Sequence, residues 1–306
     1  MMIISASRRT DIPAFFGEWF ANRIAAGYFC SVNPFNPNQT KTVSLLPEDV
    51  AAIVFWTKNP RPFFKQLDQL DGMGYNYLFL DTLNDYPRLF EPAVPAIGQR
   101  VAAFQALSDR IGPRRVVWRY DPIILSSVTP LEYHLERIDN LAKMLSGYTE
   151  RLIISFMDFY PKVQSRIART PRLETVEFRD WLAEEQSAAL DRLCAGIAAS
   201  AARYRLQVFT CAEAGDFSRY QIAKGACIDA TLLAALFPSA CGIPTGRRKD
   251  AAQRQHCQCA AAVDMGVYDT CKFQCFYCYA NAGSKTVERT LARHDPNGAS
   301  LIGPCV

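Results

Sequence analysis

Three cysteines near the C-terminus, Cys271, Cys275 and Cys278, follow the spacing C-x3-C-x2-C. Thiolates this close together in one loop can hold one corner of a cubane iron–sulfur cluster. Such clusters are normally bound by four cysteine thiolates. A loop with three leaves one iron without a protein thiolate, and that iron can bind another ligand directly. The spacing therefore predicts a [4Fe-4S] cluster with an open coordination position.

A second group of cysteines lies ahead of this triad and can form a second metal site. Four thiolates suffice for a complete auxiliary [4Fe-4S] cluster, with Cys211 and His256 as reserve ligands. Structural zinc is the alternative for both groups, because zinc sites use four Cys or His ligands and often contain close cysteine pairs. The four members of this second group are Cys227, Cys241, Cys257 and Cys259.

The distribution of all eleven cysteines favours metal binding over disulfide bonds. Nine of them fall in the last third of the chain, whereas a disulfide-stapled domain is typically short, secreted and evenly cross-linked. We expect Cys30 and Cys194 to be inert buried thiols and Cys305 to be a loose thiol near the end of the chain.

The bulk composition is that of an ordinary globular protein. Among 306 residues, 49% are hydrophobic and 21% charged, which supports a packed core and excludes a disordered chain. The net charge of +4 neither requires nor excludes a nucleic-acid partner. The first residues do not form a signal peptide, and no apolar run reaches the roughly 18 residues of a membrane span. We therefore expect a cytoplasmic protein with no membrane partner.

Residues 1–215 alternate between short apolar runs and longer amphipathic stretches. The runs are rich in β-branched and aromatic residues, as buried parallel strands are, and helices are expected between them at 15–26, 93–111, 131–145 and 175–204. Six strand–helix units indicate an α/β fold, either a barrel or an open doubly wound sheet. The predicted strands are 3–6, 53–56, 77–80, 116–118, 152–156 and 206–209.

A polar segment follows each predicted strand. In a parallel barrel the carboxyl ends of all strands open on one face, where loops build the active site. We therefore expect these segments to share a polar cavity. Beyond residue 216 the helical period fades, which predicts a barrel domain at 1–215 and a cysteine-rich extension at 216–306 packed on the barrel mouth. The segments are 7–11, 57–59, 81–84, 119–121, 158–160 and 210–213.

The cysteine triad, with Tyr277 just before its third member, resembles the signature of the radical S-adenosylmethionine (SAM) superfamily. Other segments resemble a bacterial family of uncharacterised proteins with a C-terminal triad of this type, and TKN and RYDP distantly resemble the spore photoproduct lyase branch. Here the triad follows the expected barrel instead of its first strand, as in a circular permutation, and 263–268 is expected to be the strand that leads into it. The resembling segments are SASRRTDIP, FWTKNP, WRYDPI, ISFMD, QRQHCQC and HDPNGASLIG.

The resemblance implies a fold, a cofactor and a reaction. The fold is a partial or permuted (β/α)6 TIM-type barrel with a C-terminal iron–sulfur segment. SAM binds the open iron of the [4Fe-4S] cluster through its amino and carboxylate groups. An electron donor such as flavodoxin or ferredoxin reduces the cluster, which cleaves SAM to methionine and a 5′-deoxyadenosyl radical. That radical abstracts hydrogen from a substrate, whether small molecule, peptide or nucleic acid.

The charged residues beside the strands supply candidates for the SAM site. Tyr277 occupies the position that lies against adenine in the superfamily. A cation is needed near the methionyl carboxylate, for which Arg119 and Lys58 are suited. Asp121 and Asp81 are suited to accept hydrogen bonds from the ribose hydroxyls.

One alternative is a protein that catalyses no reaction. It would be a zinc- or iron–sulfur-stabilised binding protein, and nucleic acid would be a suitable partner. A basic stretch can contact phosphates, although it can also be a solvated loop or neutralise a thiolate cluster. It comprises Arg247, Arg248, Lys249 and Arg254.

Overall fold

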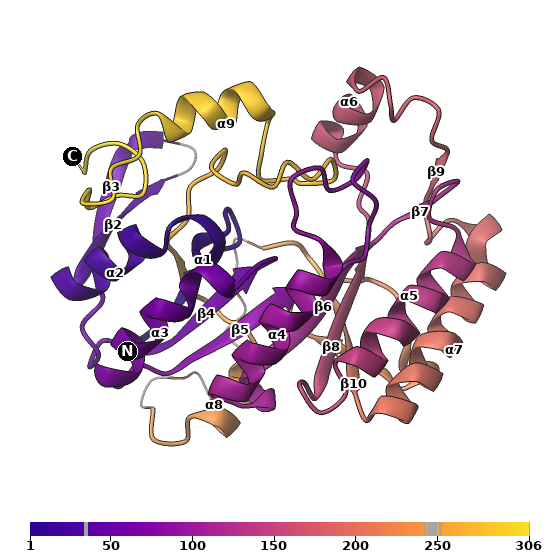
Figure 1. The fold of residues 1–306 in the computed structure, drawn as a ribbon, viewed down its shortest axis with the longest axis horizontal. Helices are drawn as coiled ribbons and strands as arrows, with labels where there is room; N and C mark the ends of the chain where they lie inside the picture. Colours follow the sequence, from indigo (N-terminus) through magenta and orange to yellow (C-terminus); the bar gives the residue numbers. More distant parts are fainter. Residues whose placement is uncertain (34–35, 241–242, 244–249, 251–252, 306) are drawn as a thin grey trace.

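The computed structural model describes residues 1–33, 36–240, 243, 250 and 253–305. Its centre is one eight-stranded sheet in the order β11-β10-β8-β6-β5-β4-β1-β12, and all neighbouring pairs are parallel (Figure 1). The strands are β1 (Met2–Ala6), β4 (Val50–Thr57), β5 (Tyr77–Thr82), β6 (Val116–Ile123), β8 (Arg151–Phe156), β10 (Gln207–Cys211), β11 (Ile222–Gly225) and β12 (Val263–Asp264).

All six predicted strands are confirmed, because five apolar runs lie within a strand of this sheet and the sixth, at 206–209, lies in β10 except for Leu206. The short strand β12 pairs with β1, which brings Val263 beside Ile4. The short strand β12 therefore leads into the cysteine triad, and it covers the first two residues of the predicted strand at 263–268. Both β11 and β12 lie beyond residue 215 and extend the same sheet, and the division into two domains stays a prediction.

Helices cover one face of the sheet. Trp19, Phe55, Phe104 and Trp118 belong to one buried core that the helices and strands share. The predicted helix at 175–204 is wrong in its first part, because Phe178 pairs with Ser126 and Trp181 is buried at 2% exposure. The helices on this face are α2 (Gly17–Ala26), α3 (Phe64–Gly72), α4 (Ile97–Ile111), α5 (Leu131–Met144) and α7 (Ser187–Tyr204).

The cysteine-rich region covers the opposite face. Strand residues Val54, Leu80 and Val117 pack there against Ile228 and Leu233, which flank or lie on α8 (Ala230–Leu236). The described residues between 226 and 262 thus take the place that the longer helices take on the other face. This explains the fading helical period, since the segment gains its order from packing on the sheet.

The remaining elements lie at the edges. Figure 1 shows α6 and α9 above the sheet and the β2–β3 hairpin beside α9. None of the described helices is long and apolar enough to span a bilayer. These elements are α1 (Ile12–Phe15), β2 (Tyr28–Asn33), β3 (Asn36–Ser44), β7 (Leu125–Ser126), α6 (Pro161–Arg169), β9 (Phe178–Arg179) and α9 (Ser284–Leu291), with 3-10 turns at Arg61–Phe63, Pro113–Arg115, Glu184–Gln186 and Ser218–Tyr220.

The expectation for Cys30 and Cys305 is wrong. The two cysteines form a disulfide bond that joins β2 to the end of the chain. The backbone N–H of Cys30 donates to the carbonyl of Ala299 at 2.8 Å, so the last residues already lie against the hairpin. Residues 275 positions apart are brought together by packing that no sequence spacing indicates.

Candidate functional site

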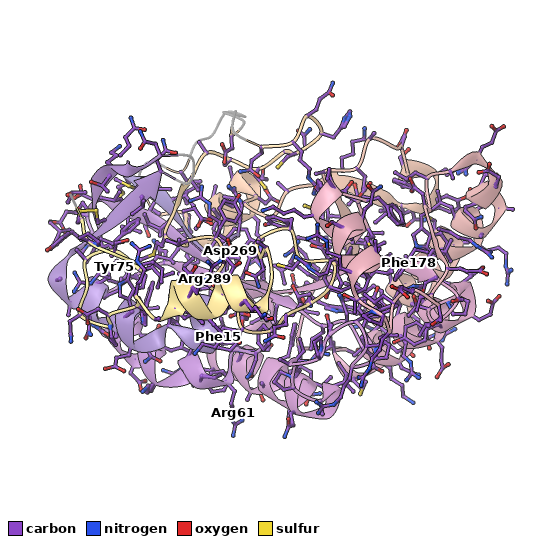
Figure 2. All side chains as sticks on the ribbon, turned by 90° about the horizontal axis from the view of Figure 1, so that it is seen from above. Phe15, Arg61, Tyr75, Phe178, Asp269 and Arg289 are labelled. Atoms are coloured by element: carbon purple, nitrogen blue, oxygen red, sulfur yellow. A yellow bond between two sulfur atoms is a disulfide. The ribbon has the colours of Figure 1, made fainter. Side chains whose placement is uncertain are left out.

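The chain between β12 and α9 crosses the edge of the sheet where the strands end. Figure 1 shows this segment running toward α6, and Figure 2 looks down on the same edge, with Asp269 labelled within the segment. Asp264 fixes its start, because its carboxylate accepts hydrogen bonds from the hydroxyls of Ser5 and Ser7 at 2.6 Å and from the N–H of Arg8 at 2.9 Å. A Cβ at Gly266 would lie 1.9 Å from Ser7 Oγ, so only glycine fits this crossing.

We call Cys271, Cys275 and Cys278, with the residues between them, the outer cysteine loop. Cys275 is buried at 7% exposure, whereas Cys271 and Cys278 are partly exposed. Arg166 of α6 donates to the carbonyls of Cys275, at 3.3 Å, and Cys278, at 3.0 Å. The Asn281 side chain donates to the carbonyl of Cys271 at 2.8 Å. These contacts hold all three cysteine backbones from outside the loop.

Without a metal, burial disfavours the thiolate forms in this loop. Burial raises the pKa of Cys275 to about 12, although Lys58 opposes that shift. Burial also raises the pKa of Cys271, and the nearby Cys278 adds to the effect. A thiol must lose its proton to ligate a metal, so metal binding here would release protons. Among the described residues, no group of three or more His, Cys, Asp or Glu side chains has the arrangement of a site for a metal ion.

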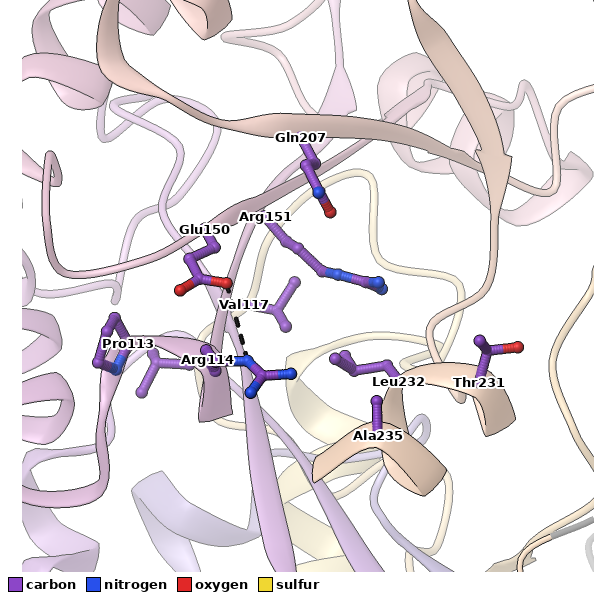
Figure 3. A pocket seen from close by; sticks show the side chains of 10 residues that line it. Pro113, Arg114, Val117, Glu150, Arg151, Gln207, Thr231, Leu232 and Ala235 are labelled. Atoms are coloured by element: carbon purple, nitrogen blue, oxygen red, sulfur yellow. Dashed lines mark ion pairs between the residues drawn. The ribbon is translucent and has the colours of Figure 1, made fainter. Parts of the chain in front are cut away.

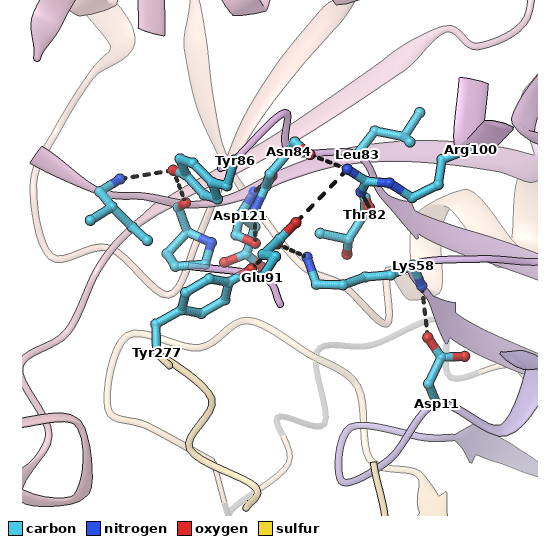
Figure 4. Close-up of polar contacts among 12 residues, drawn as sticks. Asp11, Lys58, Thr82, Leu83, Asn84, Tyr86, Glu91, Arg100, Asp121 and Tyr277 are labelled. Carbon is cyan, nitrogen blue, oxygen red and sulfur yellow. Dashed lines mark hydrogen bonds and ion pairs between the residues drawn. The ribbon is translucent and has the colours of Figure 1, made fainter. Parts of the chain in front are cut away.

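Glu91 lies beneath the outer cysteine loop and joins it to the sheet (Figure 4). Its carboxylate accepts the Tyr277 hydroxyl and pairs with Lys58 Nζ at 2.8 Å and Arg100 Nη2 at 3.8 Å. Glu91 is 3% exposed, and Lys58 Nζ lies 5.6 Å from the centre of the Tyr277 ring. Sequence reasoning missed Glu91, because it lies in the long connection after β5 and not at a strand end.

Two further buried acids stand at the same edge. The Asp11 carboxylate accepts the N–H of Lys58 at 2.7 Å, and burial raises the pKa of Asp11 to about 7. Asp81 is fully buried, neither of its carboxylate oxygens has a hydrogen-bond partner among the described residues, and burial raises its pKa well above the usual value. Burial thus favours the protonated form of Asp81, and a protonated carboxyl group can donate as well as accept a hydrogen bond.

Arg119 and Asp121 form an ion pair at the end of β6. Asp121 also accepts the Ser155 hydroxyl, and the Asn84 side chain holds the Asp121 backbone through two hydrogen bonds of 3.0 Å. Burial lowers the pKa of Arg119, but attraction to Cys227, Cys211, Tyr279 and Cys259 outweighs it and raises the pKa. Of the two predicted cations, Lys58 thus lies beside Tyr277, and Arg119 faces the other cysteines.

Those other cysteines, which we call the inner cysteine set, gather on the face of the sheet that α8 covers. Three of the four predicted members come together, and the reserve residue Cys211 joins them, its sulfur 3.2 Å from that of Cys227. The predicted ligand Cys241 lies outside the described residues, as do Arg247, Arg248 and Lys249 of the basic stretch. Arg254 of the same stretch pairs with Asp158, and the reserve ligand His256 is exposed. The set comprises Cys211, Cys227, Cys257 and Cys259.

Two pockets lie away from both groups of cysteines. One, of about 210 Å³, opens where β6, β8 and β10 begin and contains the Arg114–Glu150 ion pair (Figure 3). The other, of about 510 Å³, is lined by Asn59, Arg61 and Gln99 among others. Neither is lined by a cysteine or by a predicted SAM-binding residue.

The fold and site define an α/β protein with one parallel sheet, crossed at its carboxyl edge by a cysteine loop. Its family is now plain: the chain belongs to the DUF1848 family, described as a domain of unknown function, whose profile matches residues 3–280. The matched range runs from β1 through the outer cysteine loop. No curated protein matches the chain.

Proposed function

We propose that this protein is a radical SAM enzyme that binds a [4Fe-4S] cluster through Cys271, Cys275 and Cys278. The observation that carries the proposal is the position of the outer cysteine loop, which crosses the carboxyl edge of the sheet and contacts the Glu91–Lys58 ion pair through its own Tyr277. In parallel α/β folds this edge is where loops build active sites.

The sheet supports the further proposal of a partial, permuted (β/α) barrel. Helices cover one face, as they do the outside of a barrel, and the described residues between 226 and 262 pack on the other. The pairing of β12 with β1 lets the outer cysteine loop follow a strand despite its late position in the chain.

The three thiols fit a cluster with one open iron. All three come from one loop, and Arg166 and Asn281, which lie outside that loop, donate hydrogen bonds to its backbone carbonyls. Cys271 and Cys278 remain partly exposed, so an incoming ligand can reach them. When bound, the cluster supplies the electron for reductive cleavage of SAM. An electron donor such as flavodoxin or ferredoxin would be needed to reduce it.

The surrounding side chains can bind and orient SAM. Lys58 and Arg119 are the candidates to hold its carboxylate through charge-assisted hydrogen bonds. Asp81 and Asp121 are the candidates to bond to the ribose hydroxyls, and the Tyr277 ring offers a flat surface for adenine. Phe273, 3% exposed, packs on Phe15 at 4.6 Å between ring centres and excludes water from below the loop.

Anaerobic reconstitution tests the proposal. The loaded protein should contain about four iron atoms in the outer loop. With dithionite it should form 5′-deoxyadenosine from SAM, measured by mass spectrometry. The matched control is the variant in which Cys271, Cys275 and Cys278 are all replaced by alanine. If the loaded wild-type protein forms no more product than this variant, the protein is not a radical SAM enzyme.

A further inference from the structure

The inner cysteine set has its own environment. Its four thiols come from the end of β10, the loop before α8 and the segment before β12, and each is at most 7% exposed. Cys211 Sγ lies 3.2 Å from Cys227 Sγ, and Cys227 in turn interacts with Cys259. The N–H of Cys259 donates to Cys257 Sγ at 3.4 Å, and the N–H of Ile228 donates to Cys259 Sγ at 3.4 Å. The four sulfurs thus form one continuous group.

Three arginines surround this group. Arg119 interacts electrostatically with Cys211, Cys227 and Cys259, Arg8 with Cys259, and Arg254 with Cys211. Arg119 Nε and Arg8 Nη2 are buried donors without a hydrogen-bond partner among the described residues. Leaving such a donor unpaired is costly. Neutral thiols are weak acceptors and attract cations little, so a bound metal that holds the sulfurs as thiolates would give these donors stronger partners.

The spacing of the sulfurs favours a single ion over a cluster. Around a tetrahedral zinc ion with Zn–S bonds of about 2.3 Å, sulfurs lie roughly 3.8 Å apart. The 3.2 Å contact between Cys211 and Cys227 is slightly shorter, so these two sulfurs must move apart before both can bind one ion. An opening of about 0.6 Å would suffice for zinc. A cubane would require the apolar residues packed around the set to move much further.

We propose that Cys211, Cys227, Cys257 and Cys259 bind one structural zinc ion. Binding Zn²⁺ would release four protons and leave a tetrathiolate with two net negative charges near Arg119, Arg8 and Arg254, which also pair with Asp121, Asp250 and Asp158. The ion would tie β10 to the segment that covers the sheet. This site goes beyond the proposed function and does not depend on the outer cysteine loop. In this proposal Cys211 is the fourth ligand, the role that the sequence alone suggests for Cys241.

The test is the zinc content of the full chain after dialysis against a chelator under reducing conditions. The wild type and the variant lacking the three outer cysteines should each retain about one zinc per chain, which separates this proposal from the first. Cys211→Ser should lower zinc affinity at least tenfold, whereas Cys241→Ser should leave it unchanged. The proposal would be overturned if Cys241→Ser lowered zinc affinity and Cys211→Ser did not. Four extra irons at this site, or a Cys211–Cys227 disulfide without metal, would also overturn it.

A second measurement covers the case in which Cys211→Ser does not fold. X-ray absorption at the zinc edge of the wild-type protein should show four sulfur ligands at about 2.3 Å. Cobalt exchanged into the same protein should give sulfur-to-cobalt charge-transfer bands. A zinc shell with nitrogen or oxygen ligands would exclude the four-cysteine site.

Discussion

The outer cysteine loop and the inner cysteine set place thiols in opposite settings. The outer three come from one loop of the chain at the edge of the sheet, and two of them are partly exposed. The inner four come from three separate segments and are all buried. Catalytic metal sites keep a coordination position open, whereas structural sites are closed by protein ligands. The exposure of each group therefore matches the role that we propose for it.

Charge separates the two groups as well. Buried carboxyl groups stand below the outer loop, where Glu91 pairs with Lys58 and Arg100 and where Asp81 has no partner among the described residues. Arginines surround the inner set. Acids can bond to the amine and hydroxyls of a bound ligand, whereas arginines compensate a fixed negative charge. The cysteines alone therefore do not set the chemistry of either site.

Cys275→Ala should have the largest effect of these substitutions and should distinguish the two groups of cysteines most clearly. It should abolish iron binding in the outer loop and the formation of 5′-deoxyadenosine, because two thiolates cannot hold the corner of a cluster. Zinc in the inner set should remain. Metal analysis and product assays on one preparation measure both. Cys194→Ala is the control, since Cys194 is buried in the helix-side core and belongs to neither group. Unchanged iron in Cys275→Ala would remove the distinction between the groups.

Glu91→Ala tests what supports the outer loop. It leaves Lys58 and Arg100 as buried cations without their carboxylate, a change that typically costs about 3–5 kcal/mol of stability. Urea denaturation of the metal-free protein measures the loss. Glu150→Ala is the control, because the Glu150 side chain is 56% exposed and its pair with Arg114 is long, at 3.9 Å. That change should cost less than about 1 kcal/mol. Equal losses would show that Glu91 is not a buried anchor.

Glu213→Gln tests the charge balance next to the inner set. Burial raises the pKa of Glu213 from 4.5 to about 7, while the N–H of Phe156 donates to its carboxylate at 3.0 Å and opposes that shift. The folded protein holds this proton more tightly than the unfolded chain, so wild-type stability falls as the pH rises from 4.5 to 7. The loss is about 3 kcal/mol for a shift of this size.

The glutamine variant should lack that loss, so it should gain on the wild type by up to about 3 kcal/mol between pH 5 and pH 8. Denaturation curves at the two values measure the difference. Glu288→Gln, which neutralises an exposed carboxylate on α9, should show no such gain. Parallel pH profiles for the wild type and Glu213→Gln would contradict the prediction.

Lys58→Met should produce the smallest effect on the proposed chemistry, and SAM binding is measured on folded protein because the change also removes one of the two cations paired with Glu91. If Lys58 holds the carboxylate, its loss weakens binding by about 1.5–3 kcal/mol, and Lys58→Arg should restore part of it. Arg119→Met should weaken SAM binding less, because Arg119 faces the inner set. Anaerobic calorimetry measures both affinities. A larger loss of affinity in Arg119→Met would show that Arg119 holds the SAM carboxylate. The proposed division of roles between the two groups of cysteines would then be wrong.

Several parts of the fold follow from the sequence. The six apolar runs predict the main strands, because buried parallel strands need continuous apolar residues, and the strands' common direction brings the polar segments to one edge. The expected helix at 175–204 fails in its first part, because Phe178 and Trp181 find partners in tertiary packing. The sequence does not single out Glu91, because a buried acid in a long connection cannot be distinguished from a surface acid by its position in the sequence.

The two groups of cysteines mark the boundary between sequence and structure. The spacing of Cys271, Cys275 and Cys278 already requires them to lie close together, because a chain of so few residues cannot separate them in any fold. Only the tertiary structure decides that Cys211 contacts Cys227 and that Cys30 joins Cys305. Those contacts depend on the order of strands in the sheet and on which segment covers its face. Neither the periodicity nor the spacing of residues encodes that order.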